Sequence, residues 1–208
     1  MSIKIYIVGE LESNCYFIID DETKDTFIVD PGAEPEKLDY ELKKFNLNPC
    51  GIFNTHGHID HISGNSYLKS KYNIPVYIHE QDNNLLTDSI SNLSSIMYTE
   101  TIILPSADKL LTDNEIIRKN NIELKIIHTP GHTPGSICIV YNKKYIFTGD
   151  TLFCGSVGRC DLPGGNEQIL LNSLEKLKHL PESMIILPGH GPQCNLKDEL
   201  IHNPYLTR

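Results

Sequence analysis

The sequence predicts a single globular domain with an α/β or all-β core, in which short apolar strands end at a common metal-binding rim. The chain has 208 residues, of which 39% are hydrophobic and 22% charged, with no low-complexity block and no visible repeat. This length suits one domain and allows a sizeable core to be buried. Histidine and aspartate groups directly follow several of the apolar runs. Their repeated placement after strands predicts a metal centre at one edge of the fold.

Apolar periodicity and turn residues predict the individual elements. We expect strands at 3–8, 15–20, 26–29, 51–54, 75–79, 122–127, 145–150 and 184–187, and helices at 34–45, 62–71 and 80–86. Between 87 and 105 the pattern weakens into Ser, Asn and isolated apolar residues that include Met97 and Tyr98. This stretch is either a lid over a substrate site or an ordinary surface connection, and the second interpretation is favoured.

The strongest signal is the run NTHGHIDH at 54–61, which has four potential metal ligands within six residues. His56 and His58 are two residues apart, so in extended backbone their rings leave the same face and can bind one ion. Asp60 and His61 are adjacent, so the chain is expected to turn into a helix here and offer this pair to a second ion. A lone histidine would more simply be solvated, but four ligands at this spacing favour metal binding.

Three later positions supply the remaining ligands. His132 lies in the Pro/Gly-rich loop HTPGHTPGS after the strand at 122–127 and is the natural third ligand for the ion at His56 and His58. Asp150 ends a buried strand, where a carboxylate is costly unless cations compensate it. His190, in PGHG, would complete the shell of the second ion.

Other polar residues near these strands are expected to have supporting roles. His128 is expected to support its loop, and His79 to be structural. Asp30, at a strand end in Asp-Pro-Gly, is more simply a turn former. The alternative for Asp30 is a partner for the second ring N–H of a metal-bound histidine.

Composition excludes several classes of protein. The net charge is −9 and the lysines are scattered, so a nucleic-acid binder is not expected. The N-terminus has no signal-peptide pattern and no stretch is long enough to span a bilayer, so the cytoplasm is the default location and no membrane partner is expected. The six cysteines are widely spread without a CxxC motif, and we expect them to be reduced, with no disulfide. Cys154 and Cys160 flank the expected pocket and are not expected to bind the metals.

The order HxHxDH, HTPGHTPGS, GD and PGHG resembles the metallo-β-lactamase-fold superfamily over essentially the whole chain. The resemblance implies one domain over 1–208, built as a four-layer αββα sandwich with metals at one edge. The sequences at 149–153 and 155–159 resemble the glyoxalase II (hydroxyacylglutathione hydrolase) branch, and the ending at 199–206 is similar to the short bacterial members of that branch. Full-length glyoxalase II has a C-terminal helical extension that contributes to its glutathione pocket, and this chain is expected to lack it.

The resemblance also implies a set of site residues. Metal 1 would be held by His56, His58 and His132, metal 2 by Asp60, His61 and His190, and Asp150 would bridge the two. The ions are expected to be divalent, with zinc favoured over iron or manganese. Arg159 takes the place of a basic residue that contacts glutathione in that family, but the aromatic residue that follows it there is absent here, where Asp161 stands.

The expected function is metal-dependent hydrolysis of a small-molecule thioester. Two zinc-like ions about 3.5 to 4 Å apart would lower the pKa of a shared water toward about 7 and so supply hydroxide at neutral pH. Asp60 would orient the hydroxide proton, and Asp150 would hold both ions. Arg159 would dock a substrate carboxylate, so Arg159→Ala should mainly raise KM in steady-state assays, with kcat little changed.

Alternatives to the thioesterase remain open. A persulfide dioxygenase of the same superfamily would use one iron held by two histidines and one carboxylate. A lactonase or other ester hydrolase would share the dinuclear core, and a scaffold with a vestigial site is the non-enzymatic alternative. Asp150 and the lack of a signal argue against antibiotic hydrolysis, because true β-lactamases are exported and lack a bridging Asp here. The sequence leaves open whether the chain is a monomer or a homodimer.

Overall fold

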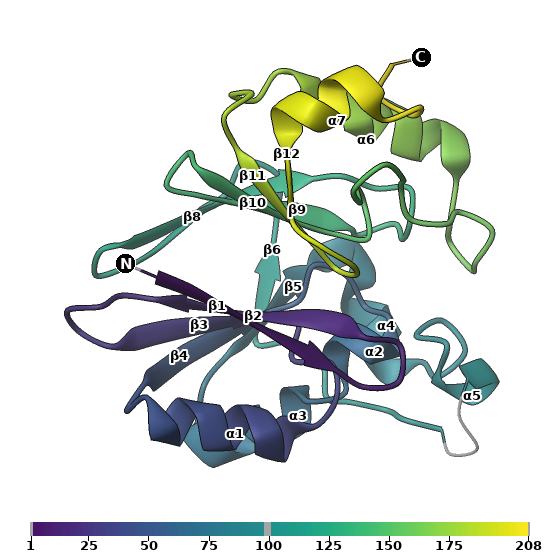
Figure 1. The fold of residues 1–208 in the computed structure, drawn as a ribbon. Helices are drawn as coiled ribbons and strands as arrows, with labels where there is room; N and C mark the ends of the chain where they lie inside the picture. The colour runs from purple at the N-terminus through teal and green to yellow at the C-terminus, as the bar shows by residue number, and fades with distance from the viewer. Residues whose placement is uncertain (1, 98–100, 208) are drawn as a thin grey trace.

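Two six-stranded β-sheets pack face to face, and helices cover the outer face of each sheet (Figure 1). The computed structural model describes residues 2–97 and 101–207. Helices α1 (Pro35–Lys44) and α3 (Asn65–Tyr72) lie against the first sheet, and α6 (Glu167–Lys178) and α7 (Leu196–His202) against the second. This is the expected αββα sandwich.

The first sheet has the strand order β1-β2-β3-β4-β5-β6. Its strands are β1 (Ser2–Val8), β2 (Ser13–Ile19), β3 (Asp25–Val29), β4 (Asn48–Phe53), β5 (Val76–His79) and β6 (Lys109–Leu111). The first three strands pair antiparallel, and β3 to β6 pair parallel. Helices therefore connect the parallel strands, as crossover connections require.

The second sheet has the strand order β12-β11-β10-β9-β8-β7. Its strands are β7 (Ile116–Lys119), β8 (Ile122–His128), β9 (Ile137–Tyr141), β10 (Tyr145–Gly149), β11 (Ile185–Pro188) and β12 (Cys194–Asn195). Only β10 and β11 pair in parallel, and α6 lies in the connection between them. The carboxyl ends of β10 and β11 consequently lie side by side.

Three apolar layers hold the sandwich together. Phe53, Phe147 and Tyr141 belong to the cluster between the two sheets and are almost completely buried. A second cluster lies beneath α1, and a third beneath α6 and α7. Burying side chains of this size contributes roughly 1.5 to 3 kcal/mol each to the free energy of folding before entropy is subtracted.

The outer helices α1 and α6 are amphipathic, and the side chain of Asn166 caps α6. Helix α1 starts with Pro at its first turn and buries Leu38 and Leu42, which are four residues apart and so share a face. Helix α6 starts after Asn166, whose side chain accepts a hydrogen bond from the N–H of Ile169. In both helices the buried leucines face the sheet that the helix covers.

The helix expected at 62–71 is divided in two. Helix α2 (Ile59–Ile62) begins earlier, and α3 follows after Gly64. The Gly64 N–H donates to the carbonyl of Pro31 at 2.7 Å, and a Cβ at this position would overlap that carbonyl. The close approach breaks the helix, and it packs the ligand-bearing turn against the loop after β3.

The remaining differences from the expected elements are short. The helix expected at 80–86 is a 3₁₀ turn, Glu80–Asp82, followed by α4 (Asn83–Thr87). Strands β6, β7, β9 and β12 and helices α5 (Ser94–Met97), α6 and α7 are additional to those expected. Among the described residues, no helix is both long enough and apolar enough to cross a membrane.

The expectation that all cysteines are reduced is wrong for one pair. Cys154 and Cys194 form a disulfide, with their Cα atoms 5.9 Å apart, although 40 residues separate them in sequence. The parallel pairing of β10 with β11 brings the loop that contains Cys154 beside β12, which contains Cys194. Sequence spacing gives no information on this proximity. Cys15, Cys50, Cys138 and Cys160 are free.

Counting thiols tests this pairing. Protein denatured and alkylated without reductant should take up four labels, and six after reduction, as measured by intact mass. A Cys194→Ser variant should label once more than wild type without reductant, because Cys154 is released. Six labels on unreduced wild-type protein would contradict the disulfide.

Candidate metal centre

Four chain segments that follow strands converge on one edge of the sandwich. The 54–61 run follows β4, and His132 lies in the loop after β8. Asp150 directly follows β10, and His190 follows β11. The isolated bridge between Ser13 and His190 joins the edges of the two sheets beside these segments. All seven predicted ligands are therefore brought to one place.

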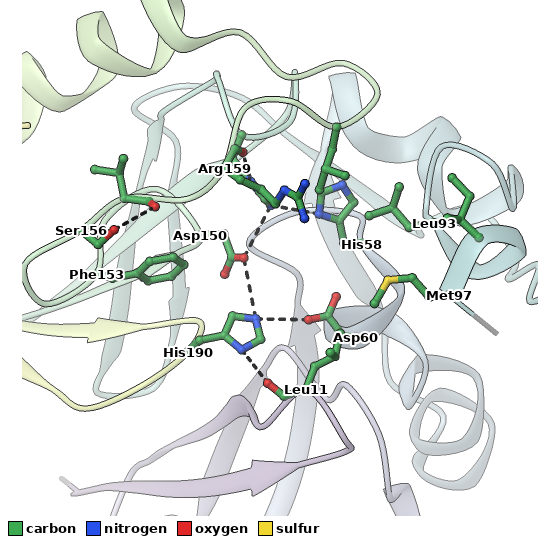
Figure 2. A pocket seen from close by; sticks show the side chains of 14 residues that line it. Leu11, His58, Asp60, Leu93, Met97, Asp150, Phe153, Ser156, Arg159 and His190 are labelled. Carbon is green, nitrogen blue, oxygen red and sulfur yellow. Dashed lines mark hydrogen bonds and ion pairs between the residues drawn. The ribbon is translucent and has the colours of Figure 1, made fainter.

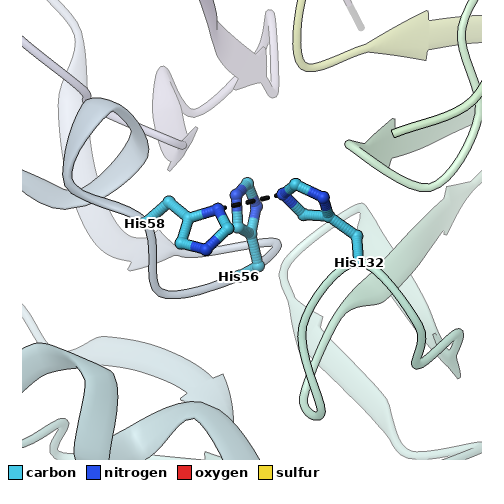
Figure 3. Close-up of side chains that lie close together, drawn as sticks. All are labelled: His56, His58 and His132. Atoms are coloured by element: carbon cyan, nitrogen blue, oxygen red, sulfur yellow. Dashed lines mark hydrogen bonds between the residues drawn. The ribbon is translucent and has the colours of Figure 1, made fainter. Parts of the chain in front are cut away.

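His56, His58 and His132 form the first group, and their rings converge in Figure 3. One ligand atom from each lies within 4.8 Å of the others, and all three side chains are buried. The Nδ1 of His58 lies 2.9 Å from the Nε2 of His132. The Nε2 of His56 is buried without a hydrogen-bond partner among the described residues. A cation bound between the rings would satisfy these lone pairs, so the group fits a metal ion.

Asp60, His61 and His190 form the second group. The Oδ2 of Asp60 lies 3.3 Å from the Nε2 of His61 and 3.2 Å from the Nε2 of His190. The two ring nitrogens are 3.3 Å apart. Helix α2 turns Asp60 and His61 in the same direction, as the sequence predicted. Two imidazoles and one carboxylate facing a common point again fit a divalent cation.

Asp150 lies between the two groups. Its Oδ1 is 3.5 Å from the Nε2 of His61, and its Oδ2 is 3.6 Å from the Nε2 of His132 and 3.7 Å from that of His190. The Oδ1 is buried with no hydrogen-bond partner among the described residues. A Cβ at Gly189 would overlap this carboxylate, so the glycine of PGHG makes room for it. The position of Asp150 fits a ligand shared by two ions.

Outer hydrogen bonds orient three of the rings. The Nδ1 of His61 lies 3.1 Å from the Oδ2 of Asp30, whose carboxylate also accepts hydrogen bonds from the N–H and Oγ1 of Thr55. The Nδ1 of His132 faces the carbonyl of Arg159 at 2.7 Å, and that of His190 faces the carbonyl of Leu11 at 3.0 Å. Such contacts fix the tautomer that presents Nε2 to a metal.

The structure therefore favours the alternative interpretation of Asp30, as a histidine partner. Turn formation accounts for only part of its role, because its carboxylate is buried against His61. The supporting roles expected for His79 and His128 are confirmed: their rings stack with centroids 3.8 Å apart, and the Nε2 of His128 faces the carbonyl of Pro134 at 2.9 Å.

Sequence reasoning missed Asp82, a fully buried carboxylate that connects the two ligand loops. Its oxygens accept hydrogen bonds from the N–H of Gly57 at 3.0 Å, the N–H of Gly135 at 2.6 Å and the Oγ1 of Thr133 at 2.6 Å. Burial raises the pKa of Asp82 and outweighs the effect of these donors. A buried acid after a short strand was the available signal, but its partners are 25 or more residues away.

The two groups differ in the protonation of their histidines. Burial, followed by the charges of neighbouring histidines, lowers the pKa of His56 well below its usual value and that of His58 to about 3. Burial acts in the same direction on His61, but Asp60, Asp150 and Asp30 outweigh it and hold the pKa of His61 well above its usual value. The pKa of His190 is raised for the same kind of reason. His56 and His58 therefore favour the neutral form that binds a metal, whereas the carboxylates around His61 and His190 favour the protonated form of these two rings.

This difference predicts unequal proton release on metal binding. The second equivalent of a divalent ion should release more protons than the first near pH 7, because the carboxylates beside His61 favour its protonated form and a bound metal displaces that proton. Calorimetric titrations of metal-free protein in buffers of different protonation enthalpy measure this number. Asp30→Asn, which removes one charge that holds the proton, should reduce the difference. Equal release for both equivalents in wild-type protein would contradict the assignment.

The metal centre opens into a cavity of about 730 Å³ (Figure 2). Arg159 lines this cavity, where the sequence predicted a substrate contact. Its guanidinium also makes a two-pronged ion pair with Asp161 at 2.6 and 2.7 Å. Docking of a substrate carboxylate by Arg159 remains a prediction, and Asp161 would compete for it.

The stretch 87–105 is more than the surface connection that was favoured. Leu93, Ile96 and Met97 line the same cavity as His58 and Asp60. Leu93 and the helix α5 (Ser94–Met97) approach the metal centre because the carbonyl of Asn92 accepts a hydrogen bond from the N–H of Ile59, beside Asp60. Tyr98 lies outside the described residues. The segment therefore contributes a wall of the site.

Comparison with known proteins identifies the family. The model of the metallo-beta-lactamase superfamily matches residues 8–190. The chain belongs to this superfamily. The matched range includes all seven side chains that converge in the metal centre, so the resemblance seen in the sequence is confirmed.

Proteins with sequences similar to this chain carry names of different activities. Hydroxyacylglutathione hydrolase GloC of Haemophilus influenzae is 35% identical over 215 residues, covering 100% of this chain and 99% of that protein. The structure of BLEG-1 B3 metallo-beta-lactamase is 38% identical, covers 100% of both chains and has a TM-score of 0.95. TTHA1623, solved in a di-iron-bound form, is 33% identical, covers 98% and 100%, and has a TM-score of 0.85. This chain is thus a metallo-β-lactamase-fold hydrolase with a site suited to two divalent ions.

Proposed function

We propose that this hydrolase is a thioesterase of the glyoxalase II type, which cleaves S-acyl thiol conjugates with two divalent ions. The observation that carries the proposal is the position of Asp150, within 3.5 to 3.7 Å of ring nitrogens from both ligand groups. The relative named hydroxyacylglutathione hydrolase GloC, which matches the chain over its full length, supports the same reaction class.

The residues of the metal centre have separate roles in the proposed reaction. The first ion would be held by His56, His58 and His132 and the second by Asp60, His61 and His190, and Asp150 lies where it could serve both. When bound, two such ions lower the pKa of a shared water and polarise a carbonyl, so no nucleophilic side chain is needed. The Oδ2 of Asp60 accepts a hydrogen bond from the Oγ of Ser13 at 3.0 Å, and the Asp60 carboxylate would orient the proton of a water at the metal centre. Arg159 orients the substrate at the cavity wall.

Zinc is the proposed metal, because histidine nitrogen and carboxylate oxygen suit it. The TTHA1623 structure is a di-iron-bound form, so iron is the metal that the measurement of metal content must distinguish from zinc. A complete second group, with ring nitrogens of His61 and His190 3.3 Å apart, supports two ions rather than the single iron of a persulfide dioxygenase.

The deciding experiment combines metal analysis with turnover. Metal content per chain is measured by plasma emission on protein purified without added metal, together with hydrolysis of S-D-lactoylglutathione and a set of simpler thioesters. About two zinc ions per chain with thioester hydrolysis would support the proposal. One iron, no hydrolysis, and oxygen uptake with glutathione persulfide would replace it with the dioxygenase.

A second candidate function is β-lactam hydrolysis. The sequence argues against it, but the structure named BLEG-1 B3 metallo-beta-lactamase is 38% identical to this chain over its whole length. A chromogenic cephalosporin belongs in the same assay. The thioesterase proposal expects kcat/KM for thioesters to exceed that for the cephalosporin. The reverse order would favour a lactamase.

A further inference from the structure

The cavity beside the metal centre has a strongly apolar wall. We call Leu93, Ile96 and Met97 the α5 wall, and it lies in the same cavity as His58 and Asp60. Figure 2 shows Leu93 and Met97 on the side of His58 and Asp60, with Phe153 across the opening beyond Asp150. Ile96 is 66% exposed and Met97 41% exposed. Apolar side chains left exposed beside a reaction centre indicate a surface that a ligand covers.

The α5 wall is anchored to the metal centre rather than loosely attached. The side-chain Oγ of Ser94 accepts from the N–H of Ile102 at 3.0 Å, and the side-chain amide of Asn92 donates to the carbonyl of Ile102 at 3.0 Å. The N–H of Ile59, next to Asp60, donates to the carbonyl of Asn92 at 2.9 Å. These bonds fix the wall relative to Asp60, so a substrate carbonyl at the metals places its attached chain against the wall.

Charge in the cavity is poorly suited to a substrate with several carboxylates. The two acidic residues that line it and belong to the metal centre, Asp60 and Asp150, would be neutralised by bound ions and are not available to a substrate. Arg159 is the single Lys or Arg among the described lining residues, and its guanidinium is already paired with Asp161. A thiol carrier with several carboxylates would have to break this pair, and the described lining offers it no second Lys or Arg side chain away from the metal centre.

We propose that the α5 wall is an apolar subsite, and that the preferred substrates are thioesters with an aliphatic chain attached on one side of the scissile bond. This inference rests on the proposed thioesterase function and names its substrate class. A chain that covers Ile96 and Met97 removes apolar surface from water, so each added methylene group that reaches them strengthens substrate binding. The chain is the acyl group or the thiol-side alkyl group, and paired substrate series tell the two apart.

The test is a chain-length series. The kcat/KM values of metal-loaded enzyme are measured for acetyl, butanoyl, hexanoyl and octanoyl thioesters of one small neutral thiol, and for acetyl thioesters of matching alkyl thiols. In one of the two series, the acyl or the alkyl-thiol series, kcat/KM should rise by up to about fourfold per methylene group until the α5 wall is covered. The double variant Ile96→Asn/Met97→Gln should flatten that rise. Both residues are exposed, so the variant should fold.

Ile90→Asn is the matched control. Ile90 is 62% exposed in the same stretch but is not a lining residue of the cavity. This variant should keep the wild-type chain-length dependence. Two flat series in wild-type enzyme that still hydrolyses thioesters would overturn the apolar subsite and leave the thioesterase standing. The subsite would also be overturned if the dependence of kcat/KM on chain length were flattened equally in Ile90→Asn and in the wall variant.

Binding without turnover separates this inference from the proposed function. S-alkyl thioethers of the same chain lengths cannot be hydrolysed, and calorimetry measures their Kd. The Kd should fall as the alkyl chain lengthens in wild-type protein but not in the wall variant. This result supports the apolar subsite even if no thioester is cleaved. In that case only the proposed thioesterase function is contradicted. Binding that does not depend on length overturns the subsite.

Discussion

An Asp150→Ala protein should lose about one metal ion per chain and at least about 10³-fold in kcat. The carboxylate lies between the two ligand groups, so its removal leaves each group with one ligand fewer and frees the ions to separate. A thousandfold loss corresponds to about 4 kcal/mol of transition-state stabilisation, in the range expected for a metal that polarises a carbonyl. Metal analysis and thioester turnover on the same sample measure both effects.

Two further variants control this prediction. Asp150→Asn keeps the shape of the side chain but removes its charge, so it should also lose metal. Asp198→Ala removes an exposed carboxylate on α7 and should change neither quantity. An Asp150→Ala protein with a full metal complement and wild-type activity would refute the shared-ligand assignment.

Asp82→Ala should lower the free energy of unfolding by about 3 kcal/mol or more. The change leaves the N–H groups of Gly57 and Gly135 and the hydroxyl of Thr133 buried without their acceptor, and each such loss costs about 1 to 3 kcal/mol. For a chain of this size the melting temperature should fall by about 10 °C. The affinity for the first metal should fall about 10- to 100-fold, because both ligand loops are released.

Thermal denaturation of metal-free protein separates the stability effect of Asp82 from its effect on metal binding. Asp82→Asn retains one acceptor oxygen and should lie between wild type and Asp82→Ala. Glu80→Ala, on the same 3₁₀ turn but exposed, should leave the melting temperature and metal affinity unchanged. If Asp82→Ala melted like Glu80→Ala, the connection between the loops would have no energetic role.

The metal ligands could be predicted because their signal is local. Strand β4 ends in buried apolar residues and is followed by His56 and His58, and helix α2 makes the turn that presents Asp60 and His61 to a second ion. His132, Asp150 and His190 likewise follow strands that their own apolar residues define. Period-2 and helical geometry act over a few residues, so the sequence alone determines which side chains reach the rim.

Only the tertiary structure decided the features that depend on distant pairs. The partners of Asp82 are 25 and more residues away. The Cys154–Cys194 bond depends on the parallel pairing of β10 with β11. The α5 wall, read from sequence as a surface connection, reaches the cavity through the bond between Ile59 and Asn92. Local patterns set each segment's conformation, whereas packing between segments sets which buried polar groups and apolar surfaces meet. The metal ligands could therefore be predicted from the sequence, whereas the shape of the substrate pocket could not.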